Sequence, residues 1–137
     1  MDEPFAYFEH DADMGIVGRG ESIEEAFEHA ATAMFAMMAD PAQIRPQTSV
    51  AIEFEEADAE LALVTWLNLL LGQARSHALV FGRFQLRRDG AIWSGSAAGE
   101  PWRAGLERGV EVKGATLTSL ALRQQDGIWE ARCVVDV

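Results

Sequence analysis

The pattern of apolar and polar positions predicts a first helix that begins at Ser22. Ser22 precedes Glu25 by three residues, the spacing of a capping box, in which the serine caps a free backbone N–H and the glutamate reaches back to the serine amide. Pro41 and Pro46 are expected to end this helix, leaving Asp40 in the exit turn. Between Ser22 and Pro41, apolar residues recur at helical spacing and define one apolar stripe: Ile23, Phe27, Ala30, Ala31, Met34, Phe35 and Met38.

A second helix is predicted to start at Asp58 or nearby, because apolar residues again recur at helical spacing. The residues expected to face inward are Leu61, Val64, Leu67, Leu70 and Leu71. Short strands are expected at 5–9 and 14–19, and residues 50–54 alternate between apolar and polar as a half-buried strand does. The remainder of the chain, after the second helix, is predicted to be strand.

Two Asp-Gly pairs predict β-hairpins in this second half. Asp89-Gly90 and Asp126-Gly127 each lie between alternating segments, the favoured signal for a type I′ turn, in which both central residues need a positive φ. The flanking segments are 79–88 with 91–98, and one ending near Gln124 with 128–135. Two helices on a predominantly antiparallel sheet make an α+β fold. Without repeats or linker-like stretches, a single compact domain over residues 1–137 is expected.

The charge balance argues against direct nucleic-acid binding. The chain carries 22 acidic and 11 basic residues, a formal net charge of −11. Because proteins bind phosphate backbones by neutralising them with Lys and Arg, direct, tight binding of RNA or DNA is not expected. An acidic surface can serve solubility alone. The alternative is that the carboxylates meet a basic protein partner or a hard cation.

Composition also bears on compartment. No apolar run approaches the roughly 20 residues that cross a bilayer, and the acidic N-terminus lacks the basic-then-apolar pattern of a signal peptide. Cys133 is the only cysteine, so no internal disulfide is possible, which fits a reducing compartment. We expect a cytoplasmic protein without membrane association.

Standard catalytic motifs are absent from the sequence. It contains no P-loop, no dinucleotide-binding glycine motif, no HExxH and no CxxC. Cys133 lies within an apolar strand, where a thiol is more often a small core residue than a reactive group. His10 has the titration range of a ligand or base, although a lone strand histidine is more often structural.

Carboxylates are the stronger candidates for chemistry. Asp11 and Asp13 are two residues apart, so in an extended segment both point to one face. Asp40 lies at a helix exit, and Asp136 is followed by Val137 with its terminal carboxylate. If the terminal strand runs beside the first one, Asp13 and Asp136 converge and form an all-oxygen site suited to Ca²⁺, Mg²⁺ or Mn²⁺. Spacing alone fits solvated strand ends at least as well.

The chain resembles the archease family along nearly its whole length. The family's signature Glu-His-Thr-Ala-Asp-(aliphatic)-Gly-(aliphatic) is matched by Glu9-His10-Asp11-Ala12-Asp13-Met14-Gly15-Ile16. Further family patterns are matched, in order, by Ser22-Ile23-Glu24-Glu25-Ala26-Phe27, by 33–40, by Trp66-Leu67-Asn68, by Gly99-Glu100-Pro101 and by Glu111-Val112-Lys113. The ending, 129–137, is similar to the family's terminal strand, which closes with Asp and one aliphatic residue.

The resemblance implies an α+β domain with a divalent cation held by oxygen ligands. Ca²⁺ is the ion expected in a structure, with Mg²⁺ or Mn²⁺ possible in function. The implied metal ligands are Asp13, Asp136 and Val137, with Asp40 as a less certain fourth. The implied task is non-catalytic: activating an RtcB-type RNA ligase, which joins 3′-phosphate or cyclic-phosphate ends to 5′-hydroxyl ends in tRNA splicing or RNA repair. The accessory protein promotes guanylylation of the ligase from GTP and its multiple turnover. Lys113 is expected to contact the partner or a phosphate.

The chain departs from the family pattern at three notable positions. Asp11 stands where the family has Thr, and Leu117 and Thr118 stand where it commonly has Tyr and His. The loss of that Tyr and His points to an altered partner preference. Asp11 adds a carboxylate beside the implied site, where it either tightens cation binding or lies in solvent. Two other functions stay open: a stand-alone divalent-metal-dependent phosphohydrolase using the same carboxylates, and a general chaperone or interaction module whose acids form a solvated face.

Overall fold

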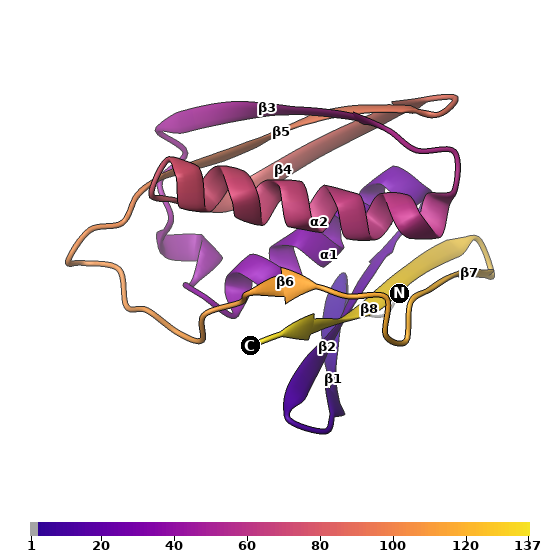
Figure 1. Cartoon of the computed structure of the whole chain (residues 1–137), viewed down its shortest axis with the longest axis horizontal. Coiled ribbons are helices and arrows are strands. Elements are labelled where there is room, and N and C mark those ends of the chain that lie inside the picture. The colour runs from indigo at the N-terminus through magenta and orange to yellow at the C-terminus, as the bar shows by residue number, and fades with distance from the viewer. Residues whose placement is uncertain (1–2) are drawn as a thin grey trace.

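The computed structural model describes residues 3–137 as two antiparallel sheets and two helices (Figure 1). In chain order the elements are β1 (Phe5–His10), β2 (Asp13–Gly20), α1 (Ile23–Ala36), the 3₁₀ helix η1 (Pro41–Gln43), β3 (Thr48–Glu55), α2 (Ala59–Ser76), β4 (Leu79–Asp89), β5 (Ile92–Pro101), β6 (Gly114–Ala115), β7 (Ala121–Gln125) and β8 (Ile128–Asp136). One sheet has the order β1-β2-β8-β6, with β7 also paired to β8, and the other has the order β3-β5-β4. The α+β prediction is confirmed, but the strands form two sheets instead of one.

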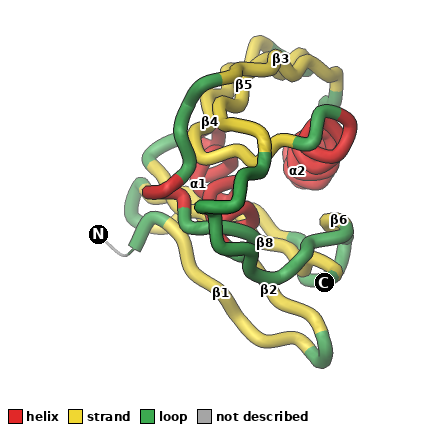
Figure 2. The backbone as a smooth tube through the Cα atoms, turned by 90° about the vertical axis from the view of Figure 1, so that its left-hand side faces the viewer, coloured by secondary structure: helices red, strands yellow, loops and turns green. Residues whose placement is uncertain are grey.

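Helix α1 lies between the two sheets (Figures 1 and 2). It packs against β2 and β8 on one side and against β4 on the other. This position requires small side chains, and Ala26, Ala30, Ala31 and Ala33 are fully buried. At Gly18 of β2 a Cβ atom would lie 2.1 Å from the carbonyl oxygen of Ala26, so the helix and the strand are in backbone contact there.

The predicted helix cap is largely confirmed. Ser22 Oγ accepts a hydrogen bond from the Glu25 amide at 3.0 Å. The Glu25 carboxylate reaches the amide of Glu21 instead of the predicted Ser22 amide. Helix α1 ends at Ala36, ahead of Pro41, and the exit turn leads into η1.

Helix α2 begins after Asp58, whose carboxylate accepts from the amides of Glu60 and Leu61. It packs against β3, β4 and β6. Leu61 is 40% exposed, so its predicted inward orientation is wrong. At about 100° per residue, Leu61 lies roughly 180° around the helix from the buried Leu70. The apolar stripe is centred on Trp66 and Leu70, and a leucine on the opposite side faces solvent.

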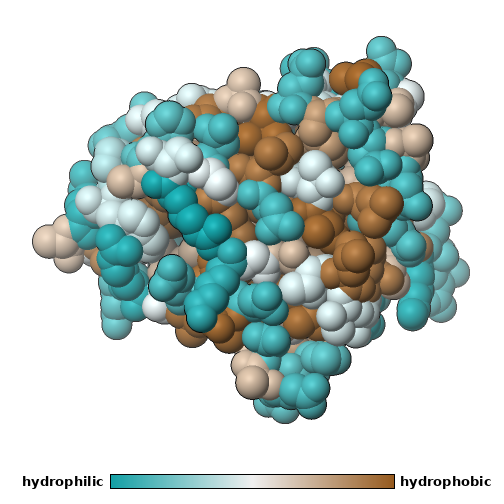
Figure 3. Space-filling view, viewed as in Figure 1, coloured by the Kyte–Doolittle hydropathy of each residue, from teal (hydrophilic) through white to brown (hydrophobic). Residues whose placement is uncertain are grey.

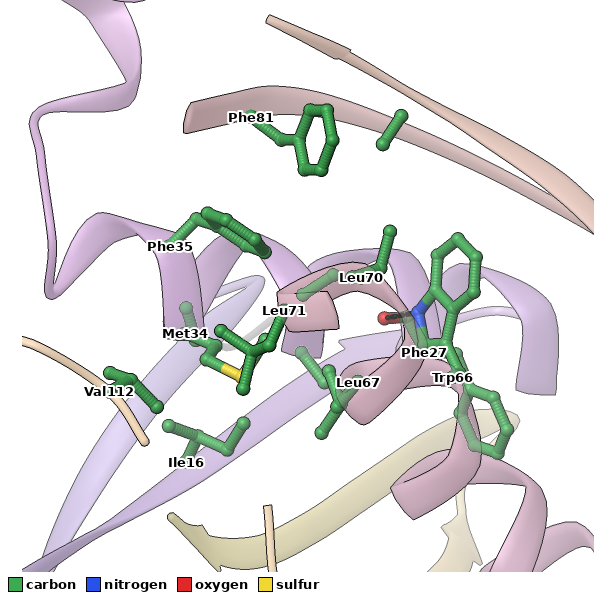
Figure 4. Close-up of a cluster of buried hydrophobic side chains, with 14 of the residues drawn as sticks. Ile16, Phe27, Met34, Phe35, Trp66, Leu67, Leu70, Leu71, Phe81 and Val112 are labelled. Atoms are coloured by element: carbon green, nitrogen blue, oxygen red, sulfur yellow. Dashed lines mark hydrogen bonds between the residues drawn. The ribbon is translucent and has the colours of Figure 1, made fainter. Parts of the chain in front are cut away.

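The hydrophobic core joins both helices to both sheets (Figure 4). Trp66 is fully buried, and its indole N–H donates to the carbonyl of Phe27 at 3.1 Å, so α2 is fixed to α1 by a directional bond. Phe27 stacks on Trp93 with ring centroids 5.3 Å apart. Other buried members drawn in Figure 4 are Ile16, Met34, Phe35, Leu67, Leu70, Leu71, Phe81 and Val112.

One of the two predicted type I′ turns is confirmed. Asp126 and Gly127 are the central residues of the β7–β8 turn and both have positive φ, 53° and 80°. In the β4–β5 turn, Asp89 pairs with Ile92, so the central residues are Gly90 and the alanine after it. Only Gly90 has a positive φ there, the pattern of a type II′ turn. The prediction of type I′ at that hairpin is wrong because the strand extends one residue further.

The segment 102–113 is an irregular loop, although strand was predicted for the whole second half of the chain. Among residues 3–137, no helix combines the length and the apolar character needed to cross a membrane.

Candidate functional site

The C-terminal residue Val137 reaches Asp13 at one edge of the first sheet, where β2 begins and β8 ends. Strands β2 and β8 are antiparallel, and their ladder pairs Met14 with Val135. Continuing that register by one residue places Asp13 opposite Asp136. Beyond it, the Val137 amide donates to Asp13 Oδ1 at 3.3 Å. The predicted approach of the terminal strand is therefore found, although β8 lies beside β2, which carries Asp13, and not beside β1. Residues opposite each other in an antiparallel pair project from the same face, so both carboxylates belong to one face.

Strand β6 places Lys113 beside these residues. Gly114 pairs with Asp136, and the Lys113 amide donates to the Asp136 carbonyl at 2.8 Å. Lys113 is exposed and is the only lysine in the sequence. Sequence reasoning named Lys113 and Asp136 separately, and the structure brings their backbones into direct contact.

Helix α2 holds β6 in place through two side chains that sequence reasoning did not single out. Asn68 Nδ2 donates to the Ala115 carbonyl at 3.1 Å, and Asn68 Oδ1 accepts from the Ala115 amide at 2.9 Å. Seven residues further along α2, Arg75 Nη2 donates to the carbonyls of Val112 and Lys113 at 2.7 and 2.6 Å. We call Asn68 and Arg75 the α2 clamp. In the sequence, Asn68 belongs to the matched family pattern Trp66-Leu67-Asn68, whereas Arg75 is marked only as a polar residue in a helix of high apolar content.

The β1–β2 turn borders the site. His10 pairs with Asp13 across the two strands. Asp11 has a positive φ of 51°, a conformation that Asp adopts more readily than a β-branched residue such as Thr. Its side chain is 95% exposed, and it lies 3.9 Å from His10 Nδ1. An aspartate therefore suits the backbone of this turn better than the threonine of the family pattern.

Asp40 lies in a different setting. Its Oδ1 accepts from the Ala42 amide at 3.0 Å and so caps η1. It borders a surface depression that is also lined by Glu107 and Arg108. Within residues 3–137, no three His, Cys, Asp or Glu side chains form a cluster that could hold a metal ion. The structure brings Asp13 into contact with the Val137 backbone next to Asp136, whereas Asp40 is engaged elsewhere.

Cys133 is not part of the site. It is fully buried in β8, and burial raises the pKa of its thiol to about 12. A thiol with that pKa stays protonated at neutral pH and is a poor nucleophile. The structure confirms the prediction of a core residue.

The surface near β6 is partly apolar. Figure 3 shows apolar patches among hydrophilic residues on the face that carries α2 and β6. Exposed apolar side chains of α2 and of the segment after β6 include Leu61, Leu69 and Leu117. Leu117 is 61% exposed, so one of the departures from the family pattern lies at the surface. The neighbouring Thr118 carbonyl accepts from the Val134 amide of β8.

This fold and site define a class: a small α+β protein of two sheets in which residues near both chain ends bring carboxylates to one sheet edge. The model of the archease protein family (MTH1598/TM1083) matches residues 5–137. The archease of Sulfolobus acidocaldarius is 38% identical over 136 residues, covering 97% of this chain and 98% of that protein. The archease of Methanothermobacter thermautotrophicus is 32% identical over 137 residues, covering 97% and 98%. The chain belongs to the archease family.

Solved structures agree with this assignment. The solution structure of Methanobacterium thermoautotrophicum protein 1598 matches with a TM-score of 0.88 at 32% identity, covering 98% of this chain and 99% of that one. A crystal structure of an archease from Thermotoga maritima, described as a possible chaperone, matches with a TM-score of 0.65 at 20% identity, covering 100% and 98%. The second likeness concerns the fold alone.

Proposed function

We propose that this protein is a non-catalytic accessory protein that activates an RtcB-type RNA ligase in the cytoplasm. It promotes guanylylation of the ligase and its multiple turnover in tRNA splicing or RNA repair. Family membership supports this assignment. The observation that carries it is the meeting of Asp13 and Val137 at the sheet edge where Asp136 ends β8 and Lys113 lies alongside.

The donor atoms at this edge fit a hard divalent cation. Asp13 Oδ1 receives one backbone N–H, and its second oxygen accepts no hydrogen bond from residues 3–137. The Asp136 side chain is exposed and is likewise free of a hydrogen-bond donor within the described chain. Carboxylate oxygens are the ligands that Ca²⁺, Mg²⁺ and Mn²⁺ prefer. Asp13, Asp136 and Val137 would hold the ion, and Asp40 would join them only after leaving the Ala42 amide.

The residues around the edge have separable roles in this proposal. A divalent cation bound there would help to position and neutralise nucleotide phosphates. The Lys113 ammonium would add a point charge for a phosphate or for an acidic group of the ligase. Asn68 and Arg75 keep the Lys113 backbone against β8, because both contact the segment 112–115. None of these roles requires a nucleophile or a general base on this chain.

The overall charge fits a protein partner better than RNA. With a formal net charge of −11, the surface favours association with a basic protein and disfavours a phosphate backbone. In this proposal the ligase holds the RNA, and the accessory protein acts on the ligase.

The test is multiple-turnover RNA joining by the cognate ligase with GTP and Mn²⁺, with this protein at substoichiometric amounts. Acceleration is expected with the natural protein and should be lost with Asp13→Ala. Asp89→Ala is the matched control, because Asp89 is an exposed carboxylate at the far end of β4. A chaperone function predicts that both variants raise ligase yield equally and independently of divalent cations. Activation that survives in folded Asp13→Ala protein would overturn the metal-centred proposal.

A further inference from the structure

A cavity of about 390 Å³ lies between the C-terminal part of α2 and the loop 102–113. Its apolar lining comes from both helices and from β4, with Phe35, Met38, Leu71 and Val80 among the contributors. Binding pockets for small organic molecules fall in this size range and are mostly apolar with a few polar groups. The cavity shares no carboxylate with the proposed metal site, so it calls for a separate explanation.

The cavity is preformed, because the loop that walls it is tied down along its length. The Trp102 amide donates to the Ala78 carbonyl at 3.3 Å. Gly109 and Val110 donate to the carbonyls of Met38 and Met37, both at 2.8 Å. Beyond them, Val112 is buried, and Arg75 holds its carbonyl. A loop with this many anchors keeps a fixed wall, and long irregular loops in compact domains are commonly functional.

Two arginines line the cavity, and neither forms an ion pair within the described chain. Arg108 places its guanidinium 4.0 Å from the ring centre of Trp102, which fixes the planar group by cation–π stacking. Arg75 uses only Nη2 for its two carbonyls, so its Nε and Nη1 donate to no other residue in 3–137. Figure 3 shows strongly hydrophilic side chains on the left of the view, where this loop lies in Figure 1.

We propose that this cavity binds a small organic anion with an apolar or aromatic body and a single carboxylate, sulfonate or phosphate group. The body would fill the apolar interior, and the anionic group would accept hydrogen bonds from Arg108 and Arg75. Glu111 also lines the cavity and is exposed. Its carboxylate disfavours polyanions, so a singly charged ligand fits better than a nucleoside triphosphate.

The charge and the shape of the cavity together narrow the class of ligand. An inorganic anion would gain nothing from Phe35, Leu71 and Val80, since these side chains offer no hydrogen-bond donors. A neutral apolar ligand would leave two cationic groups unpaired beside it. Unpaired arginines beside an apolar cavity are more notable in a chain with twice as many acids as bases.

The test uses two dyes of nearly the same shape that differ in charge. The anionic probe is 8-anilinonaphthalene-1-sulfonate, and the neutral probe is N-phenyl-1-naphthylamine, which lacks the sulfonate. The natural protein should bind the anionic probe with one-to-one stoichiometry and the neutral probe at least about tenfold more weakly, as expected for a hydrogen bond to a charged group. Amide chemical-shift changes on binding should be confined to the backbone around 74–78 and 109–112.

The variant that decides the test is Arg108→Gln, which should weaken binding of the anionic probe about tenfold. Arg123→Gln is the matched control, because Arg123 is an exposed arginine on β7, away from the cavity. Val110→Glu, at a 51% exposed lining position, should likewise weaken the anionic probe and spare the neutral one. Equal affinity for both dyes, equal effects of the two arginine variants, or chemical-shift changes scattered over the core would overturn the proposal. The proposal would also be overturned if the cavity bound neither dye and Arg108→Gln weakened binding to the ligase, because that result would identify a protein-docking pocket.

Discussion

The clamp between α2 and β6 makes a prediction that can be worked out from individual hydrogen bonds. Replacing Asn68 with Ala removes a donor at 3.1 Å and an acceptor at 2.9 Å, both directed at Ala115. A single intramolecular hydrogen bond contributes about 0.5–1.5 kcal/mol to stability. Because Asn68 is exposed, water can replace part of what is lost. We therefore expect Asn68→Ala to lower the free energy of unfolding by about 1–2 kcal/mol.

The assay is urea unfolding combined with amide hydrogen exchange. For a domain of 137 residues, that loss corresponds to a decrease in melting temperature of about 3–8 °C. Exchange of the Ala115 amide should accelerate, since its acceptor has been removed. Gln73→Ala on the same helix is the control and should change stability by less than about 0.5 kcal/mol. If Asn68→Ala is no more destabilising than this control and the Ala115 amide stays protected, the clamp does not hold β6.

Three further predictions concern buried or tightly packed groups. Arg103 Nε donates to one oxygen of the buried Glu100 carboxylate at 2.8 Å and the Arg45 amide donates to the other, and these hydrogen bonds lower the pKa of the Glu100 carboxyl although burial alone would raise it. Its contribution to stability is therefore complete above the unfolded pKa of about 4.3 and is lost as pH falls through the lower folded value. Glu100→Gln should destabilise the protein at pH 7 and flatten the decline of its melting temperature from pH 5 to 3, and an unchanged decline would contradict this. The Cys133 thiol, with its pKa raised to about 12, should react with iodoacetamide at pH 8 only when the chain is unfolded. Gly99→Ala would put a Cβ 1.9 Å from a backbone oxygen of β4 and should lower the free energy of unfolding in urea by at least about 2 kcal/mol. Gly72 has open space around it, so Gly72→Ala should stabilise α2 by about 0.5–1 kcal/mol. Similar effects of the two changes would show that the close contact at Gly99 is relieved.

Short motifs in the sequence predicted the caps and turns that depend on a few neighbouring residues. The Ser22 cap and the Asp126-Gly127 turn are confirmed, because each is decided by a few neighbouring residues. The division of the strands into two sheets could not be predicted in this way. It depends on α1 being covered by a sheet on two sides, and a stripe of seven apolar residues did not show that Ala26 and Ala33, outside that stripe, are also buried.

The site was predicted in part for a similar reason. The approach of Val137 to Asp13 requires the terminal strand to pair with an early one, which the sequence suggested only as a condition and which the structure meets through β2. The position of Lys113 depends instead on a two-residue strand held by side chains of α2. Hydrogen bonds between residues 37 to 47 positions apart leave no periodic trace in a sequence. The roles of Asn68 and Arg75 were visible only in the fold.

Asp40 shows why a carboxylate at a helix exit is a weak signal for a metal ligand. Its carboxylate accepts a hydrogen bond from the amide two residues later, at the start of η1, so its position after a helix reflects capping. Its membership of a metal site stays a proposal that Asp40→Asn would test. That change keeps an oxygen acceptor for the Ala42 amide and removes the charge, so a loss of divalent-cation binding without a loss of stability would assign Asp40 to the site.

The proposed function requires the charge on Asp13, at the junction of β2 and β8, for activation of the ligase. The most direct measurement is the rate of GMP transfer from labelled GTP to the ligase in Mn²⁺, with the natural protein, Asp13→Asn or Asp89→Asn. Asp13→Asn keeps an oxygen that can accept from the Val137 amide, so it alters the charge and leaves the contact in place. Acceleration is expected with the natural protein and with Asp89→Asn, and none with Asp13→Asn. Equal acceleration by all three would contradict the proposed role of Asp13.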